Sequence, residues 1–214
     1  MAPAATAATV WAQVLDFLFP PRCAGCKARG TPLCPTCAAG VERYSGPQEG
    51  AIVAALVFTG ATRECIHALK YDGQRRYAPI LAALARPALA YLPPPDALVP
   101  VPLAPQRARA RGFNQSALIA DALAAPLGWC VEPHWLTRVR ETPPQVEQDR
   151  AARRVNVAGA FAADAAVQGR HICVVDDVMT TGATFDACKA ALWAMGAASV
   201  RAFVVAREMK PGAR

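Results

Sequence analysis

One segment near the C-terminus, residues 171–184, constrains the fold more than any other part of the chain. It contains a short apolar run rich in β-branched residues at 172–175, as expected of a central parallel strand that is covered on both faces. Two aspartates follow, then a short loop rich in threonine, and then a helical pattern over residues 183–195. The segment therefore predicts a loop between the carboxyl end of a strand and the amino end of a helix. Open α/β sheets bind ligands at this position.

The residues of this loop suit a phosphate group. Free backbone N–H groups and the helix dipole favour an anion there, and Gly182 lets the backbone approach it closely. The candidate phosphate ligands are Thr180, Thr181, Gly182, Ala183 and Thr184. Asp176 and Asp177 cannot bind phosphate themselves and suit sugar hydroxyls or a metal. The alternative is an ordinary strand-to-helix turn with a threonine N-cap, although a cap alone does not call for two adjacent acids.

Four of the eight cysteines form a second motif, two Cys-x-x-Cys pairs that are separated by a short fingertip. The four residues are Cys23, Cys26, Cys34 and Cys37. Four thiolates on one tetrahedral metal leave no open position, so the spacing predicts a closed, structural Zn²⁺ site. An iron–sulfur cluster, a rubredoxin-like iron and two disulfides are the alternatives. The remaining cysteines are scattered, and we interpret them as small apolar residues.

Composition limits the class of protein. The chain has 214 residues, of which 54% are hydrophobic, so it can form one full domain and a small appendage. No apolar run reaches the ~18 residues of a membrane span, and the N-terminus lacks the features of a signal peptide, which predicts a cytoplasmic protein. The net charge of +7 is compatible with a phosphate-bearing substrate, with a nucleic acid or with a solvated basic surface.

Strand and helix patterns alternate along the chain, which predicts an α/β fold with a mainly parallel sheet flanked by helices. We expect further strands at 51–58, 97–101 and 199–206, and helices at 9–19, 62–70, 76–90 and 113–127. The basic stretch 137–156 is expected to be a lid or a disordered loop. The predicted domains are an N-terminal helix with the four-cysteine zinc module at 1–45 and the α/β domain at 46–214.

Residues 174–184 resemble the phosphoribosyl pyrophosphate (PRPP) signature of type I phosphoribosyltransferases. The resemblance implies a type I phosphoribosyltransferase-like, Rossmann-like fold for the α/β domain. It implies that Asp176 and Asp177 hold the ribose hydroxyls at the catalytic centre, and that the threonine loop holds the 5′-phosphate. Catalysis would then consist of stabilising the departing pyrophosphate and excluding water by lid closure.

The pyrophosphate of PRPP needs a separate cationic site and usually Mg²⁺. In the resembled family a short loop after an earlier central strand binds it, which by strand order corresponds to residues 102–106. The candidate cations of this site and of the lid are Lys70, Arg107, Arg111 and Arg150. For any one arginine the alternative is a solvated face.

Further motifs follow one another along the whole chain: Leu-Phe-Pro-Pro-x-Cys at 18–23, His-x-x-Lys-Tyr at 67–71, Pro-Val-Pro-Leu at 100–103, Arg-Gly-Phe-Asn-Gln at 111–115, Thr-x-x-Gln at 142–145 and Arg-x-x-Asn at 153–156. In this order they are similar to the ComF family, the competence protein F group of bacterial DNA-uptake proteins. One departure lies at 146–148, where Val-Glu-Gln occupies a segment in which we expect a leucine.

The resemblance implies functions of different classes. One is a phosphoribosyltransferase that transfers ribose 5-phosphate from PRPP to a base that the sequence does not specify. Another is a protein of natural competence that handles internalised single-stranded DNA beside a helicase-like partner, with tryptophans as candidate stacking groups. These are Trp11, Trp129, Trp135 and Trp193, and core packing is the alternative, preferred for Trp193. A PRPP sensor without catalysis is the third.

Overall fold

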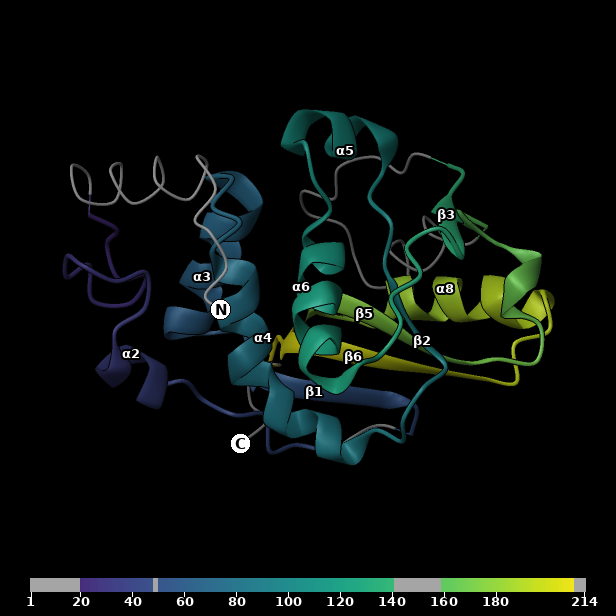
Figure 1. Cartoon of the computed structure of the whole chain (residues 1–214), viewed down its shortest axis with the longest axis horizontal. Coiled ribbons are helices and arrows are strands. Elements are labelled where there is room, and N and C mark those ends of the chain that lie inside the picture. Colours follow the sequence, from purple (N-terminus) through teal and green to yellow (C-terminus); the bar gives the residue numbers. More distant parts are fainter. Residues whose placement is uncertain (1–19, 48–49, 141–158, 210–214) are drawn as a thin grey trace, which may run out of the picture.

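A four-stranded parallel sheet forms the centre of the computed structural model, which describes residues 20–47, 50–140 and 159–209 (Figure 1). Its strand order is β1-β6-β5-β2. The strands are β1 (Ile52–Val57), β2 (Ala97–Pro100), β5 (His171–Met179) and β6 (Ser199–Arg207). All neighbouring strands are parallel, which confirms the predicted α/β architecture.

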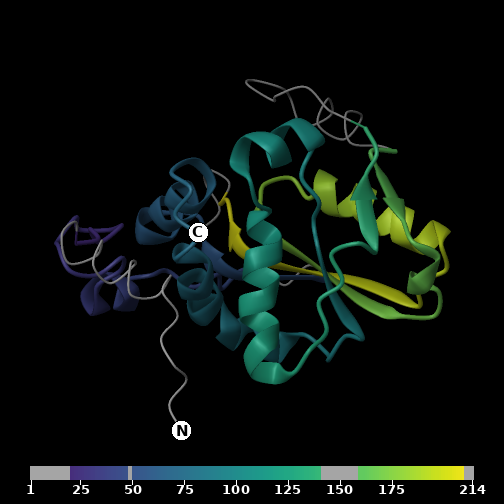
Figure 2. The same ribbon diagram turned by 45° about the horizontal axis from the view of Figure 1, so that its top comes forward.

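Alternate apolar side chains of β5 point to opposite faces of the sheet and pack into two separate cores. Cys173 and Val175 belong to the cluster formed with helices α3 (Gly60–Tyr71), α4 (Tyr77–Ala85) and α6 (Gln115–Ala124). Ile172 and Val174 belong to the cluster formed with α8 (Ala183–Ala194) and with the hairpin of β3 (Leu136–Arg138) and β4 (Phe161–Ala163). Helices therefore cover the sheet from both sides, as the turned view also shows (Figure 2).

The segment from residue 20 to residue 47 holds the cysteine pairs and the short helix α2 (Pro35–Ala39), and it lies against α3 and α4 (Figure 1). The Tyr77 hydroxyl, at the start of α4, lies 3.4 Å from the carbonyl oxygen of Arg22 and 3.3 Å from that of Pro32. Lys27 forms an exposed ion pair of 3.6 Å with Glu64 of α3. The contacts place the cysteine segment against α3 and the start of α4.

Strand β5 is longer than the sequence pattern predicted. Asp176 and Asp177 lie within the strand, so the prediction that the strand ends before them was wrong. The ladder with β6 continues to the pair Met179 and Arg207, because β6 offers backbone partners over its whole length. The loop is therefore confined to the few residues between Met179 and the start of α8.

The segment around the three alternating arginines also differs from expectation. Residues expected to form a loop at 105–106 begin helix α5 (Pro105–Arg111), since proline is favoured in the first turn of a helix. The helix ends at Gly112, whose φ of +74° is left-handed. The helix predicted at 113–127 is shorter, because Asn114 caps its start and a 3₁₀ turn, η2 (Ala125–Leu127), follows α6.

The structure also differs from other predictions, mainly in where helices and strands begin and end. The helix predicted at 76–90 consists of α4 and the 3₁₀ helix η1 (Arg86–Tyr91), and a second 3₁₀ helix, η3 (Ala165–Val167), follows β4. Residues 136–138 form β3, so the expected basic loop starts later than residue 137. Trp193 is 53% exposed, against the expected core packing, because the buried face of α8 carries Cys188 and Leu192.

The helix expected at 9–19, Trp11, Arg150 and the motifs between 142 and 156 lie outside the described residues. In the described parts of the chain, no helix combines the length and the apolar character needed to cross a membrane.

Candidate functional site

A pocket lies at the end of β5, and we call it the threonine-loop pocket. Its lining contains every candidate phosphate ligand, Thr180, Thr181, Gly182, Ala183 and Thr184, together with Asp176. Gly182 is the N-cap of α8 with a left-handed φ of +83° and has no side chain to cap the helix, but the Thr181 hydroxyl accepts from the backbone N–H of Ala183, the first residue of α8, at 3.4 Å. The N-cap is thus a glycine rather than the threonine of the alternative interpretation, although a neighbouring threonine hydroxyl bonds one N–H of the first turn; the other N–H groups of that turn have no partner within the helix.

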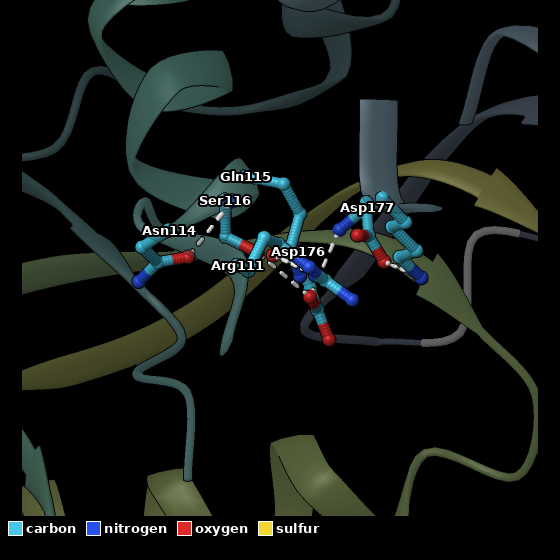
Figure 3. A network of polar contacts seen from close by, with 7 residues as sticks. Arg111, Asn114, Gln115, Ser116, Asp176 and Asp177 are labelled. Carbon is cyan, nitrogen blue, oxygen red and sulfur yellow. Dashed lines mark hydrogen bonds and ion pairs between the residues drawn. The ribbon is translucent and has the colours of Figure 1, made fainter. Parts of the chain in front are cut away.

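The two acids have different partners (Figure 3). The Ser116 hydroxyl donates to Asp176 Oδ1 at 3.0 Å, and the backbone N–H of Asp177 donates to the same oxygen at 2.9 Å. Lys70, in the last turn of α3, forms an ion pair of 2.8 Å with Asp177 Oδ1. Asp177 is 3% exposed, and its Oδ2 has no hydrogen-bond partner among the described residues. One buried carboxylate oxygen at the site is therefore unsatisfied.

The burial of the two acids and their closeness to each other determine the pKa of Asp176. Loss of hydration in the site, and then the charge of Asp177, raise the pKa of Asp176 to about 7. Lys70 and the Ser116 hydroxyl oppose this shift because they stabilise the ionised form. Asp176 thus changes charge near neutral pH, where an ordinary aspartate is fully ionised.

A second pocket of about 600 Å³, the cationic pocket, is lined by Lys70, Tyr71, Gly73, Arg107, Ala110 and Arg111. It brings together three of the four cations that the sequence analysis selected. Arg111 donates to Gln115 Oε1 and lies over the Tyr71 ring, with its guanidinium carbon 5.8 Å from the ring centroid. Desolvation lowers the pKa of Arg111 from its ordinary value. Since Lys70 also pairs with Asp177, this pocket adjoins the two acids.

Sequence reasoning did not select Ser116. The residue lies 60 positions from its partner Asp176, and no spacing rule connects the two. The only signal is its position directly after the motif at 111–115, which is part of the resemblance to the ComF family.

The four cysteine thiols form a compact cluster. The sulfurs of Cys23, Cys26, Cys34 and Cys37 all lie within 4.8 Å of one another. The sulfurs of Cys26 and Cys34 are 3.7 Å apart, close to the about 3.8 Å that a tetrahedral zinc with Zn–S bonds of about 2.3 Å requires. Burial disfavours the Cys23 thiolate, but backbone N–H groups, first among them that of Cys34, lower the pKa of this thiol to about 6. The cluster fits a zinc ion, and all its cysteines are free thiols rather than disulfides.

Comparison with known proteins agrees with this interpretation of the cluster. Residues 14–48 match the model of the double zinc ribbon domain family. The DNA utilization protein YhgH of Salmonella typhi is 39% identical over 153 residues, which are 67% of this chain and 66% of that protein. Competence protein F of Haemophilus influenzae is 31% identical over 116 residues, which are 53% of this chain and 51% of that protein.

The chain is a homologue of YhgH and of competence protein F. Competence protein ComFC of Bacillus subtilis is a further relative, 33% identical over 111 residues, or 51% of this chain and 44% of that protein. The ComF-family resemblance seen in the sequence is thereby confirmed. The chain spans just under two thirds of the length of YhgH and about half of the length of the competence proteins.

Solved structures similar to this ComF and YhgH homologue include phosphoribosyltransferases. Glutamine PRPP amidotransferase from B. subtilis, complexed with ADP and GMP, is 20% identical with a TM-score of 0.40, over 62% of this chain and 26% of that one. Hypoxanthine phosphoribosyltransferase from Trypanosoma cruzi is 15% identical with a TM-score of 0.36, over 64% and 77% of the two chains.

Proposed function

We propose that this chain binds PRPP, or a related phosphosugar, and acts as a phosphoribosyltransferase or a PRPP-dependent protein in the handling of DNA. The observation that carries the proposal is the threonine-loop pocket, which gathers the Asp176 carboxylate and all five candidate phosphate ligands in one lining. The buried Oδ2 of Asp177, which has no hydrogen-bond partner among the described residues, shows that the same pair of acids lacks a donor, at a cost of the order of 1–3 kcal/mol. Ribose hydroxyls next to a 5′-phosphate match an acid that lies beside a phosphate-binding loop.

The threonine loop supports the phosphate half of the ligand. Gly182 keeps the backbone open at the start of α8, where free N–H groups and the helix dipole attract an anion. The hydroxyls of Thr180, Thr181 and Thr184 add donors around the same pocket. A sugar that places its phosphate in this loop would bring its ring hydroxyls to Asp176, which lines the same pocket.

The cationic pocket supports the pyrophosphate half. In the transfer reaction the bond between C1′ and pyrophosphate breaks, the bond electrons leave with pyrophosphate, and a base attacks C1′. Lys70, Arg107 and Arg111 would stabilise the negative charge of the leaving group. Mg²⁺ would accompany the pyrophosphate and neutralise part of its charge. No protein nucleophile takes part in this scheme.

Isothermal titration calorimetry with ribose 5-phosphate, and with PRPP and Mg²⁺, tests the proposal. We expect binding by the unsubstituted chain and a loss of at least tenfold in affinity for Asp176→Asn and for Asp177→Asn, on the order of one hydrogen bond to a charged group each. Asp164→Asn is the matched control, because Asp164 caps η3 away from the site. Absence of binding by the unsubstituted chain would reject PRPP as the ligand.

A second candidate function, binding of single-stranded DNA, rests on a different observation. An arginine groove of about 930 Å³ between the cysteine segment and α4 is lined by Arg22, Arg29 and Arg76, with Pro20, Pro21 and Gln74. Residues 71–76 connect the linings of the groove and of the cationic pocket along the chain, and Tyr71, which lines the cationic pocket, is 71% exposed. A groove lined by cationic side chains, with an exposed aromatic ring nearby, is typical of proteins that bind single-stranded nucleic acid. The relatives' names, which refer to DNA utilization and competence, point the same way.

Fluorescence anisotropy with a labelled oligonucleotide tests this second function. We expect affinity at low salt that falls steeply as salt rises, because phosphate contacts release counterions. Arg29→Ala should weaken binding and reduce the salt dependence, whereas Arg63→Ala, which removes an arginine of α3 outside the groove, should not. Equal effects of the two substitutions would indicate only a solvated basic surface.

A further inference from the structure

The two neighbouring acids are held by different helices and lie next to different pockets. Asp177 is paired with Lys70, which lines the cationic pocket. Asp176 is bonded to Ser116 and lines the threonine-loop pocket. The pair thus divides between the two halves of the site, and each acid depends on a partner from another element.

Ser116 occupies a position that is fixed from several directions. It is fully buried in the first turn of α6. The side chain of Asn114 accepts from the Ser116 backbone N–H at 3.0 Å and donates to the carbonyl oxygen of Val101 at 3.0 Å. Asn114 therefore ties the start of α6 to the end of β2, and Val101 itself lines the threonine-loop pocket. The Ser116 hydroxyl has little freedom to turn elsewhere.

Both hydrogen bonds that hold Asp176 end on one oxygen. Oδ1 accepts from the Ser116 hydroxyl and from the Asp177 backbone N–H, as the network in Figure 3 shows. Oδ2 is then left for a donor in the threonine-loop pocket. A carboxylate with one oxygen anchored presents the other in a defined direction, and this is how a ligand hydroxyl is selected by geometry.

We propose that Ser116 is a positioning residue, which anchors Asp176 so that its second oxygen meets a hydroxyl of the bound phosphosugar. This inference rests on the proposed function, because it assumes a sugar in the threonine-loop pocket. It adds to that function a residue outside the acid pair and the threonine loop. The turn from Arg111 to Ser116 thereby serves both pockets, since Arg111 lines the cationic pocket and bonds to Gln115 one turn away.

The charge of Asp176 gives a readout that does not need a ligand. The groups that act on its ionisation are Asp177 of its own strand, Lys70 of α3 and Ser116 of α6. On α8, burial raises the pKa of Cys188, and the charge of Asp176 adds to that rise. The Ser116 hydroxyl favours the ionised form of Asp176, so its removal should raise the pKa of Asp176. A serine that only fills space would leave this pKa unchanged.

The experiment compares Ser116→Ala with Ser199→Ala in the full chain. Both remove one hydroxyl from a hydrogen bond between side chains, since Ser199 Oγ lies 2.8 Å from His171 Nδ1 at the opposite end of the sheet. Alanine is smaller than serine and favours helix, so α6 should remain folded. Ribose 5-phosphate affinity is measured by calorimetry, and the Asp176 midpoint by NMR titration of the side-chain carboxyl groups.

We expect Ser116→Ala to lose about tenfold in ribose 5-phosphate affinity, the scale of one hydrogen bond to a charged group, and to titrate Asp176 at higher pH. Ser199→Ala should match the unsubstituted chain in both measurements. Unchanged affinity in Ser116→Ala, with or without a change in the midpoint, overturns the inference while the proposed function stands. If the unsubstituted chain does not bind ribose 5-phosphate, the proposed function fails and the inference fails with it.

Discussion

The cysteine cluster and the acid pair are two polar sites that the chain builds in opposite ways. All four thiols come from one short segment, residues 23–37. The groups around Asp176 and Asp177 come instead from α3, α6 and β5, and Ser116 and Asp176 alone are 60 residues apart. The first site can therefore be predicted from the spacing of residues within one segment, whereas the second forms only when the sheet has formed.

Because of this difference, we expect substitutions at the two sites to have different consequences. A local metal site holds a short segment together, so loss of the metal should unfold that segment. A site assembled from several elements rests on a complete core, so a single change there should alter charge and binding while the fold persists. The following substitutions examine the contrast.

The largest effect is expected from loss of a zinc ligand. Cys23→Ser removes a fully buried thiolate from the cluster, and we expect loss of bound zinc and a melting temperature lower by more than about 20 °C. Cys130→Ser is the control, because Cys130 is an exposed thiol outside the cluster. Metal analysis and thermal unfolding measure both proteins. Iron instead of zinc in the unsubstituted chain would replace the zinc assignment by one of the alternatives.

The next effect concerns the buried ion pair. Lys70→Met leaves the Asp177 carboxylate buried without its cation, which should cost about 3–5 kcal/mol of unfolding free energy. Lys27→Met breaks the exposed pair with Glu64 and should cost about 1 kcal/mol or less. Denaturant unfolding measures both variants. The double variant Lys70→Met with Asp177→Asn should recover much of the loss, and equal costs for the two single variants would contradict the buried pair.

A smaller and more specific effect is expected at the threonine loop. Gly182 and Gly169 both have left-handed backbones, with φ of +83° and +71°, so alanine should strain each by about 1–2 kcal/mol. Gly182→Ala should also weaken ribose 5-phosphate binding about tenfold, because it disturbs the backbone that faces the phosphate. Gly169→Ala should leave binding unchanged. Calorimetry and unfolding together separate strain from binding, and equal affinities would exclude the loop as a phosphate site.

The sequence predicted those parts that depend on nearby residues. The zinc ligands, the parallel sheet and the threonine loop all follow from local spacing or from apolar periodicity. It did not predict the end of β5, because the two acids follow the apolar run that indicated the strand. Their partners, Lys70 and Ser116, come from distant parts of the sequence and reach the acids only in the folded chain. It did not predict α5 either, since an alternating arginine pattern has no apolar face. The spacing of residues in a single sequence does not indicate which distant residues the fold brings into contact.

The smallest effect is expected in the cationic pocket, where it decides whether the arginines of α5 form a site or a solvated face. Arg111 lines the pocket and is held by Gln115, whereas Arg109 lies on the same short helix and is absent from the pocket lining. Arg111→Gln should weaken pyrophosphate binding about fivefold at low salt and less at high salt, because screening weakens partly exposed charges. Arg109→Gln should have little effect. Equal losses from both variants, measured by calorimetry with pyrophosphate and Mg²⁺, would mean that α5 contributes only general positive charge, and the leaving-group site would then have to lie elsewhere.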